Sequence, residues 1–312
     1  MKSTKNPIMD PKKFTESLDT LMNYFENDEK CLDYIVETKY KNGWRCTKCG
    51  SKKYYLIKKR NIIRCSKCKH EKSFMADTIF GYTKLPLRQW FRNIYILATQ
   101  EKGMSAMQVY KQLGLKSYQT AWDWLHKIRK ELGKLERSKL SGEIEVGEIL
   151  LDVCYEDIEY ENARFFKKVI VVCAVEMKYD KKGQPALRKI KLRHVPDDSK
   201  KSMHSFIINN IEKNSTVKTS GFEGYKGIEN LGYIHNPIII YSAREGEIKF
   251  PRVKMIKINV KQWLGRTHRY VSVNFLQDYL NEYVYRFNRR GNKAKAFTDI
   301  MEFVILGKDR NK

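Results

Sequence analysis

Four cysteines near the N-terminus have the spacing of a metal site. They form two CxxC pairs separated by fifteen residues, and the candidate ligands are Cys46, Cys49, Cys65 and Cys68. A CxxC pair on a tight turn directs two thiolates at one point, and two such turns supply the four soft ligands that tetrahedral zinc prefers. The sequence therefore predicts one structural Zn²⁺.

The segment between the pairs, YYLIKKRNIIRC, reads as a β-hairpin, and Gly50 and Lys69 follow the pairs where tight turns are needed. We therefore interpret residues 41–75 as a zinc ribbon. The other three cysteines lie in apolar surroundings and are predicted to be core residues; they are Cys31, Cys154 and Cys173.

A second set of residues is spaced for DNA recognition. Residues 105–113 and 117–132 read as two helices joined by a turn that contains Gly114, the pattern of a helix-turn-helix. The start of the second helix is where such motifs read base edges. The predicted DNA contacts are Lys116, Ser117, Tyr118, Gln119 and Thr120. An ordinary helical hairpin has the same pattern, and only the ribbon and the net charge favour DNA.

The charge balance favours a polyanionic partner. The 312 residues include 61 Lys and Arg against 36 Asp and Glu, a formal net charge of +25. Such an excess attracts polyanions, and the neutralisation of phosphates makes binding sensitive to salt. The chain lacks an apolar segment long enough for a membrane span, and its first residues lack the apolar core of a secretory signal. We expect double-stranded DNA as the partner and the cytoplasm or nucleoid as the location.

These groups must be positioned by at least two kinds of domain. The predicted organisation is N-terminal helices over 1–40, the ribbon over 41–75, a helix-turn-helix region over 76–135, an α/β domain over 140–290, and a basic C-terminal tail over 291–312. Within the α/β domain, strands are predicted at 144–155, 164–177, 186–195, 215–219 and 237–241, with a turn at 180–184 and helices at 199–213 and 272–289. Three successive strands followed by mixed elements favour an α/β fold.

The order of these motifs resembles that of the ISXO-type insertion-sequence transposases. Their layout is a zinc ribbon, a helix-turn-helix and an RNase H-like catalytic domain. The resemblance runs from about residue 25 to 290, and its most specific segment is LQDYLNEYVYRFNRR at 276–290. It implies an α/β fold with an RNase H-like mixed sheet and flanking helices.

The family resemblance also implies where catalytic groups would lie. That family cuts and joins DNA with two divalent metals held by carboxylates, which clamp the attacking and leaving oxygens. The first family aspartate corresponds to Gly147 and the second to Ser220, while Asn259 and Lys261 match the branch that carries asparagine and lysine at the third position. Because glycine and serine supply no carboxylate, we expect no catalytic residue and no productive binding of Mg²⁺.

Two neighbouring carboxylates are candidate substitutes. Glu145 shares a face of its strand with Gly147 but lies about 7 Å away along it, too far to replace a ligand that binds at about 2 Å. Asp152 lies farther along the same strand.

Together, these features predict a transposase-derived, sequence-specific DNA-binding protein without nuclease or strand-transfer activity. It would act as a regulator, a silencer or a recruited component. One alternative is an active transposase with a rearranged acidic metal site. Another is a protein-interaction module with a basic surface. A homodimer and an unidentified protein partner are left open.

Overall fold

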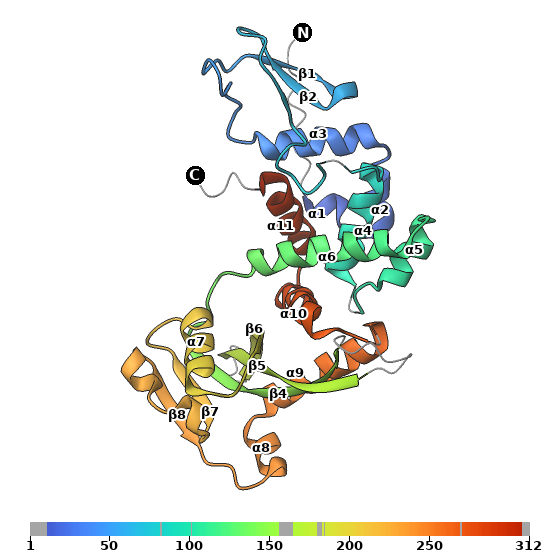
Figure 1. The fold of residues 1–312 in the computed structure, drawn as a ribbon. Coiled ribbons are helices and arrows are strands. Elements are labelled where there is room, and N and C mark those ends of the chain that lie inside the picture. Colours follow the sequence, from blue (N-terminus) through green and yellow to red (C-terminus); the bar gives the residue numbers. More distant parts are fainter. Residues whose placement is uncertain are drawn as a thin grey trace. The chain divides into compact units, whose positions relative to one another are not determined.

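The computed structural model describes residues 11–81, 83–100, 102–155, 165–179, 183, 185–268 and 270–307. The chain divides into two compact units. Unit 1 contains residues 1–131 and 289–312, and unit 2 contains residues 132–288. We call them the ribbon unit and the sheet unit and describe each by itself (Figure 1).

The ribbon unit is mainly helical outside the ribbon. Its helices are α1 (Pro11–Phe14), α2 (Leu18–Tyr24), α3 (Asp28–Lys39), α4 (Leu87–Thr99), α5 (Ala106–Leu113), most of α6 (Tyr118–Leu135) and α11 (Lys293–Leu306). Side chains of Ser17, Asn27 and Ser105 accept backbone N–H bonds at the starts of α2, α3 and α5. Such caps satisfy donors that a helix start leaves without partners.

The C-terminal segment is a helix, whereas the sequence analysis predicted a basic tail over 291–312. In α11, apolar residues recur at helical spacing, and Phe297 is fully buried among the rings of Phe14, Phe91 and Tyr95. The prediction was wrong because it weighed the lysines of this segment above its apolar periodicity. Residues 308–312 of that predicted tail lie outside the described residues.

The zinc-ribbon segment folds as a three-stranded antiparallel sheet. Strand β1 (Tyr54–Ile57) leads through a 3₁₀ turn, η1 (Lys58–Arg60), to β2 (Ile62–Cys65), which also pairs with β3 (Glu71–Ser73). The predicted hairpin is confirmed, and β3 is an addition to it. Asn61 has a left-handed backbone at the turn (φ 53°), a conformation that asparagine tolerates better than most residues.

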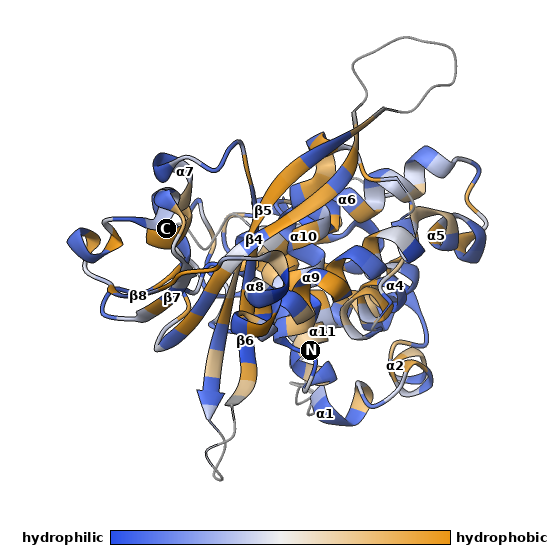
Figure 2. Cartoon of the chain, turned by 90° about the horizontal axis from the view of Figure 1, so that it is seen from below, coloured by the Kyte–Doolittle hydropathy of each residue, from blue (hydrophilic) through white to orange (hydrophobic). Residues whose placement is uncertain are grey.

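The sheet unit is built on five strands in the order β6-β5-β4-β7-β8. They are β4 (Glu143–Tyr155), β5 (Phe165–Tyr179), β6 (Pro185–Val195), β7 (Thr216–Ser220) and β8 (Ile234–Ile238). Strands β4, β5 and β6 pair antiparallel, whereas β7 pairs parallel with β4, and β8 pairs parallel with β7. This mixed sheet with flanking helices is the RNase H-like fold that the sequence predicted. Figure 2 shows long hydrophobic stretches on β4 and β5.

Each face of this sheet has its own core because side chains alternate along a strand. Odd-numbered residues of β4, such as Ile149 and Leu151, pack with α9 (Pro251–Trp263) and α10 (Val273–Asn288). Even-numbered residues, Ile144 and Val146, pack with α7 (Lys200–Asn210). The helix α7 covers only the first part of this second face, since Leu150 is 48% exposed.

Other elements of the sheet unit depart from the prediction. Two helices, α8 (Ala243–Lys249) and α9, occupy a stretch for which no element was predicted. Strand β8 spans Ile234–Ile238 instead of the predicted 237–241, because it pairs with β7 along the whole length of that strand, from Thr216 to Ser220. A π-helical turn, η4 (Leu264–His268), and two 3₁₀ turns, η2 (Glu223–Tyr225) and η3 (Ile228–Leu231), complete the unit. The turn predicted at 180–184 lies outside the described residues except for Gly183.

Among the described residues, none of the helices combines the length and apolar character needed to cross a bilayer.

Candidate metal, DNA-binding and catalytic sites

The four predicted cysteine ligands come together. Their Sγ atoms all lie within 4.8 Å of one another, with 3.5 Å between Cys46 and Cys68 and 3.6 Å between Cys49 and Cys65. Tetrahedral zinc with Zn–S bonds of about 2.3 Å needs sulfur atoms about 3.8 Å apart. The cluster therefore fits one Zn²⁺, and the ligand set is soft and complete.

Backbone geometry prepares these thiols for a metal. Gly50 and Lys69 both have left-handed φ values (69° and 59°), as expected for the tight turns that follow the two pairs. Burial raises the pKa of the Cys65 thiol, but the backbone N–H groups of Cys68 and Lys67 outweigh it and lower the pKa to about 6. Zinc binds thiolates, so these N–H groups favour the form that coordinates.

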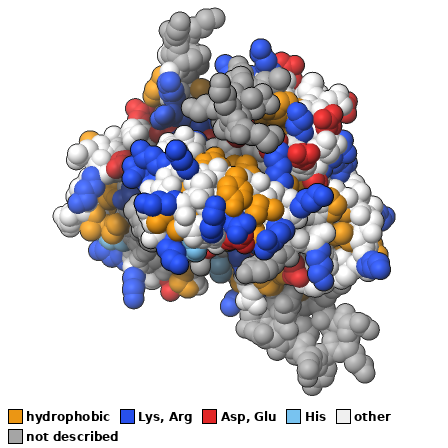
Figure 3. Space-filling view, turned by 90° about the horizontal axis from the view of Figure 1, so that it is seen from above, with side chains coloured by type: hydrophobic (Ala, Val, Ile, Leu, Met, Phe, Trp, Pro, Cys, Tyr) orange, Lys and Arg blue, Asp and Glu red, His pale blue; other side chains and the backbone are white. Residues whose placement is uncertain are grey.

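The two helices of the predicted helix-turn-helix are α5 and α6. Gly114 ends α5 in a left-handed conformation (φ 56°), and Val109, Ala121 and Leu125 are fully buried, whereas Leu113 and Leu115 beside the turn are half-buried. The five predicted DNA contacts, Lys116 to Thr120, are all exposed at the start of α6. Their side chains are accessible to a ligand, and their role in DNA binding stays a prediction. Figure 3 shows Lys and Arg side chains spread over the face that it displays.

The other cysteines follow the prediction with one exception. Cys31 and Cys173 are fully buried, whereas Cys154 is only half-buried near the end of β4. Burial raises the pKa of the Cys31 and Cys173 thiols well above its usual value, as befits inert core residues.

In the sheet unit, Gly147 and Ser220 lie on adjacent parallel strands. The β4–β7 pairing ends at Glu145 opposite Lys218, and both residues lie two positions beyond that last pair. Ser220 is the final residue of β7 and is half-buried. The structure thus places the first two family positions at the point where two parallel strands stop pairing.

The third family position lies on α9. Asn259 and Lys261 are both exposed on this helix. Asn259 follows Val253 by six residues, about 9 Å along the helix axis. Val253 itself packs directly on the first position, since a Cβ atom built on Gly147 would lie 3.2 Å from Val253 Cγ1. A side chain at position 147 would therefore need Val253 to shift by a few tenths of an ångström.

The last residue pair of the β4–β7 ladder holds the junction between α8 and α9. The Glu145 carboxylate accepts the backbone N–H bonds of Arg252 (2.9 Å) and Val253 (2.7 Å) at the start of α9. The Lys218 ammonium donates to the carbonyl of Lys249 (2.6 Å), the last residue of α8. A carboxylate at a helix start and a cation at a helix end both match the helix dipole.

Burial and hydrogen bonding act in opposite directions on Glu145. Glu145 is only 1% exposed, and this burial raises the pKa of its carboxyl. The backbone N–H of Val253 and the charge of Lys218 lower the pKa, but less strongly. Both backbone bonds go to one oxygen, Oε1. The Glu145 carboxylate therefore binds the start of α9. The sequence did not predict this contact, because Glu145 and Arg252 are 107 residues apart in the chain.

Glu148 points to the opposite face of β4. It accepts a hydrogen bond from the Tyr225 hydroxyl of η2, and burial raises the pKa of the Glu148 carboxyl. The predicted shared face of Glu145 and Gly147 is confirmed, because both contact α9, whereas Glu148 faces η2. Asp152 lies farther along that second face and is exposed.

A hydrogen-bonded relay lies beside Ser220 and runs from the buried Thr219 to the exposed Glu229. Thr219 Oγ1 is 2.8 Å from His235 Nε2, and His235 Nδ1 is 2.9 Å from Glu229 Oε1. Because Thr219 is fully buried, it is no nucleophile for an external substrate. The relay fixes the end of β7 and so positions Ser220.

Comparison with known proteins gives two matches. Residues 26–71 match the family described as transposase zinc-ribbon domain, and residues 139–288 match the family described as ISXO2-like transposase domain. No curated protein matches the chain. The two matched segments contain the cysteine cluster and the five-stranded sheet, respectively.

We predict one tightly bound zinc per chain. Elemental analysis of protein purified without chelator should find about one zinc per chain, and Cys65→Ser should lower this and unfold the ribbon, because metal-binding energy is folding energy in such small units. Cys31→Ser, which alters a buried cysteine outside the cluster, is the control and should keep its zinc. Protein that is zinc-free yet retains a folded ribbon would contradict the assignment.

We also predict that Glu145 stabilises the sheet unit through α9. Glu145→Ala removes the acceptor for two backbone donors and should lower the free energy of unfolding by about 2 kcal/mol. Glu145→Gln keeps an acceptor and should cost less, whereas Asp152→Ala, at an exposed carboxylate of the same strand, should cost almost nothing. Chemical denaturation measures all three, and equal stability of the Ala variant and the unmodified protein would refute the helix contact.

The Glu145 contact also has a pH signature. Burial raises the pKa of this carboxyl in the folded state above its value of about 4.3 in the unfolded chain. The stability that this pKa difference contributes is therefore fully present below a pH of about 4.3 and is lost as the pH rises through the folded-state pKa. The cost of Glu145→Gln should therefore shrink as pH rises through that window. A cost that grows with pH would show that the hydrogen bonds outweigh burial.

Proposed function

We propose that this chain, which carries a transposase zinc ribbon and an ISXO2-like transposase domain, is a sequence-specific binder of double-stranded DNA that neither cuts nor joins it. The two matched domains make it a DNA-binding, transposase-type protein. The loss of strand-transfer chemistry and the role as a regulator, silencer or recruited component, acting at the nucleoid, are our proposal.

The observation that carries the proposal is the packing of Val253 on Gly147. A two-metal site needs carboxylates that face the metals, and positions 147 and 220 supply none. A Cβ atom at 147 would lie 3.2 Å from Val253 Cγ1, so a metal ligand there would also need the Val253 side chain to give way.

Two further observations argue against a rearranged acidic site. Glu145, the nearest carboxylate on the same strand face, is occupied by the amides at the start of α9. Within the part of the chain that the structure describes, the four cysteines are the only group of three or more His, Cys, Asp or Glu side chains close enough to hold a metal.

DNA recognition is assigned to the start of α6. Lys116 and Gln119 are exposed there, and Gln119 Nε2 bonds the Asp123 carboxylate (2.8 Å), which holds the amide on the helix surface. A side-chain amide in the major groove can read adenine, whereas a lysine contributes mainly by neutralising phosphate.

We predict strongly salt-dependent DNA binding with separable contributions from these two residues. Affinity for duplex DNA should fall by about a thousandfold or more between 50 and 200 mM salt if six or more phosphates are neutralised. Gln119→Ala should reduce the preference among sequences, and Lys116→Ala should weaken all sequences alike and flatten the salt slope. Fluorescence anisotropy on a selected site and on random duplex measures both. If neither substitution changed the specific or the non-specific affinity, the helix-turn-helix would not be part of the DNA interface.

We predict no nicking or joining of DNA with magnesium or manganese. Gly147→Asp with Ser220→Asp should restore weak metal binding, and adding Val253→Ala should strengthen it, because the smaller side chain makes room at position 147. Each single aspartate should do little, since one carboxylate cannot assemble a two-metal site. Manganese titration and cleavage assays on one DNA compare these variants.

The same assays test the alternative of an active enzyme. Robust cleavage by the unmodified protein, abolished by Asp152→Asn, would replace our proposal with a rearranged acidic site. Asp152 is the cleaner probe because its side chain is exposed, whereas a change at Glu145 also disturbs α9. A complex with an acidic protein that survives the loss of all DNA binding would favour the interaction module instead.

A further inference from the structure

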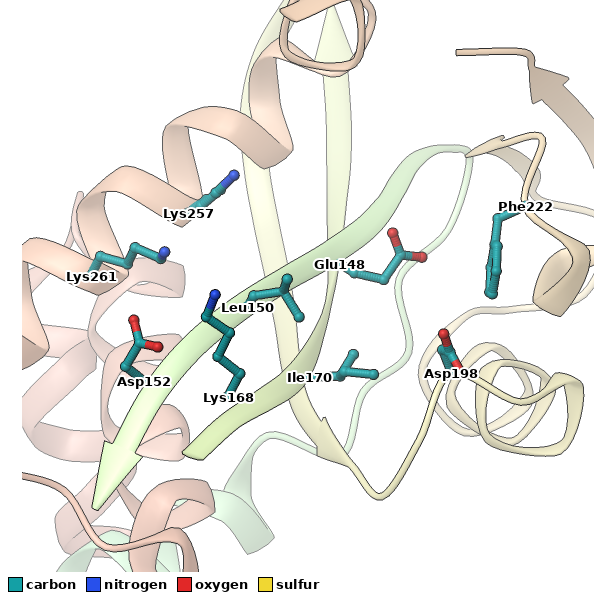
Figure 4. A pocket seen from close by; sticks show the side chains of 9 residues that line it. All are labelled: Glu148, Leu150, Asp152, Lys168, Ile170, Asp198, Phe222, Lys257 and Lys261. Atoms are coloured by element: carbon teal, nitrogen blue, oxygen red, sulfur yellow. The ribbon is translucent and has the colours of Figure 1, made fainter. Parts of the chain in front are cut away.

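A cleft of about 550 Å³ crosses the second face of the sheet unit (Figure 4). Its floor is formed by Leu150 of β4 and Ile170 of β5, which are paired neighbours. This is the part of the sheet that α7 leaves uncovered, and Leu150 is 48% exposed there. The volume falls within the range of ligand pockets, about 300–1,000 Å³.

One end of the cleft is aromatic and rich in hydrogen-bond acceptors. The ring of Phe222, 40% exposed, lies beside the carboxylates of Glu148 and Asp198 (Figure 4). The place of this ring depends on Gly224, because a Cβ atom there would lie 2.7 Å from Phe222 Cε1. A partly exposed ring beside acceptors can stack on a flat ligand that carries N–H donors.

The other end is basic. Lys257 and Lys261 are four residues apart on α9 and so share one helix face, and Lys168 of β5 adds a third ammonium group near Asp152 (Figure 4). Glu148 and Asp152, which mark the two ends, are four residues apart on β4, about 13 Å along the strand. The cleft therefore has an aromatic acceptor end and a cationic end on either side of an apolar floor.

We infer that this cleft binds one unpaired nucleotide of a DNA strand, with the base on Phe222 and its amino group toward Glu148 and Asp198, and the phosphate at Lys257 and Lys261. Cytosine and adenine carry an exocyclic amino group that a carboxylate accepts, whereas thymine carries none. The inference rests on the proposed DNA-binding function, but it uses residues of the sheet unit alone. The duplex contacts proposed at the start of α6 are not part of it.

Single-stranded decamers of dC, dA and dT, titrated against the full-length protein by fluorescence anisotropy, test the cleft. The dC and dA strands should bind about tenfold tighter than dT, and Phe222→Ala should weaken them by about tenfold, as stacking on one aromatic side chain predicts. Phe222→Trp keeps a stacking surface and should retain binding. Tyr241→Ala removes an aromatic that is 85% exposed outside the cleft and should change nothing.

Lys257→Gln combined with Lys261→Gln should weaken all three strands and reduce their salt dependence. Duplex binding should persist in Phe222→Ala, so failure of this inference is distinguishable from failure of the proposed function. Light-induced cross-linking of a strand that contains 5-iodo-deoxycytidine gives the position: we expect a cross-linked peptide that includes Phe222. Equal affinity for the three strands in the unmodified and Phe222→Ala proteins, or cross-links confined to α5 and α6, would overturn the inference.

Discussion

The arrangement of the helices in the sheet unit depends on the last residue pair between strands β4 and β7. Glu145 and Lys218 face each other there, and their opposite charges hold the start of α9 and the end of α8. A buried carboxylate is costly unless its oxygens find donors. The two amides at the start of α9 supply them, so the position of α9 follows from the need to satisfy Glu145. Val253, one of the two amide donors, is then brought onto Gly147.

This arrangement shows how the fold accommodates a glycine at position 147. A glycine at 147 would leave a void against α9 if the helix stood farther away, and close packing is what a core requires. Val253 fills that space, and Ile256 and Val260 continue the same buried face of α9. The zinc ribbon depends on different physics, because its apolar core is small, built around Trp44 and Ile63, and the four cysteines that could hold a metal form part of it.

Sequence patterns were sufficient where the determinants are local. The CxxC spacing located the cysteine cluster, Gly114 located the turn between α5 and α6, and β-branched alternation located β4, β5 and β6. The missed helices had usable signals: Pro251 opens α9, and Val253, Ile256, Val260 and Trp263 recur at helical spacing. The role of Glu145 had none, because its partners are distant in the chain and are backbone groups. The cleft beside Phe222 was likewise invisible, since β4, β5, α9 and the segment around η2 all contribute to it.

The placement of α11 has a consequence for the order in which the protein can be completed. The ribbon unit is discontinuous: the sheet unit is inserted between residue 131 and residue 289, and Phe297 of α11 fills the centre of the earlier helices. During synthesis the N-terminal helices must therefore wait for the whole sheet unit to emerge before their core is closed. A stop or frameshift within residues 132–288 would also remove the helix that closes that core. Natural selection for the ribbon unit alone would thus preserve the reading frame of the sheet unit.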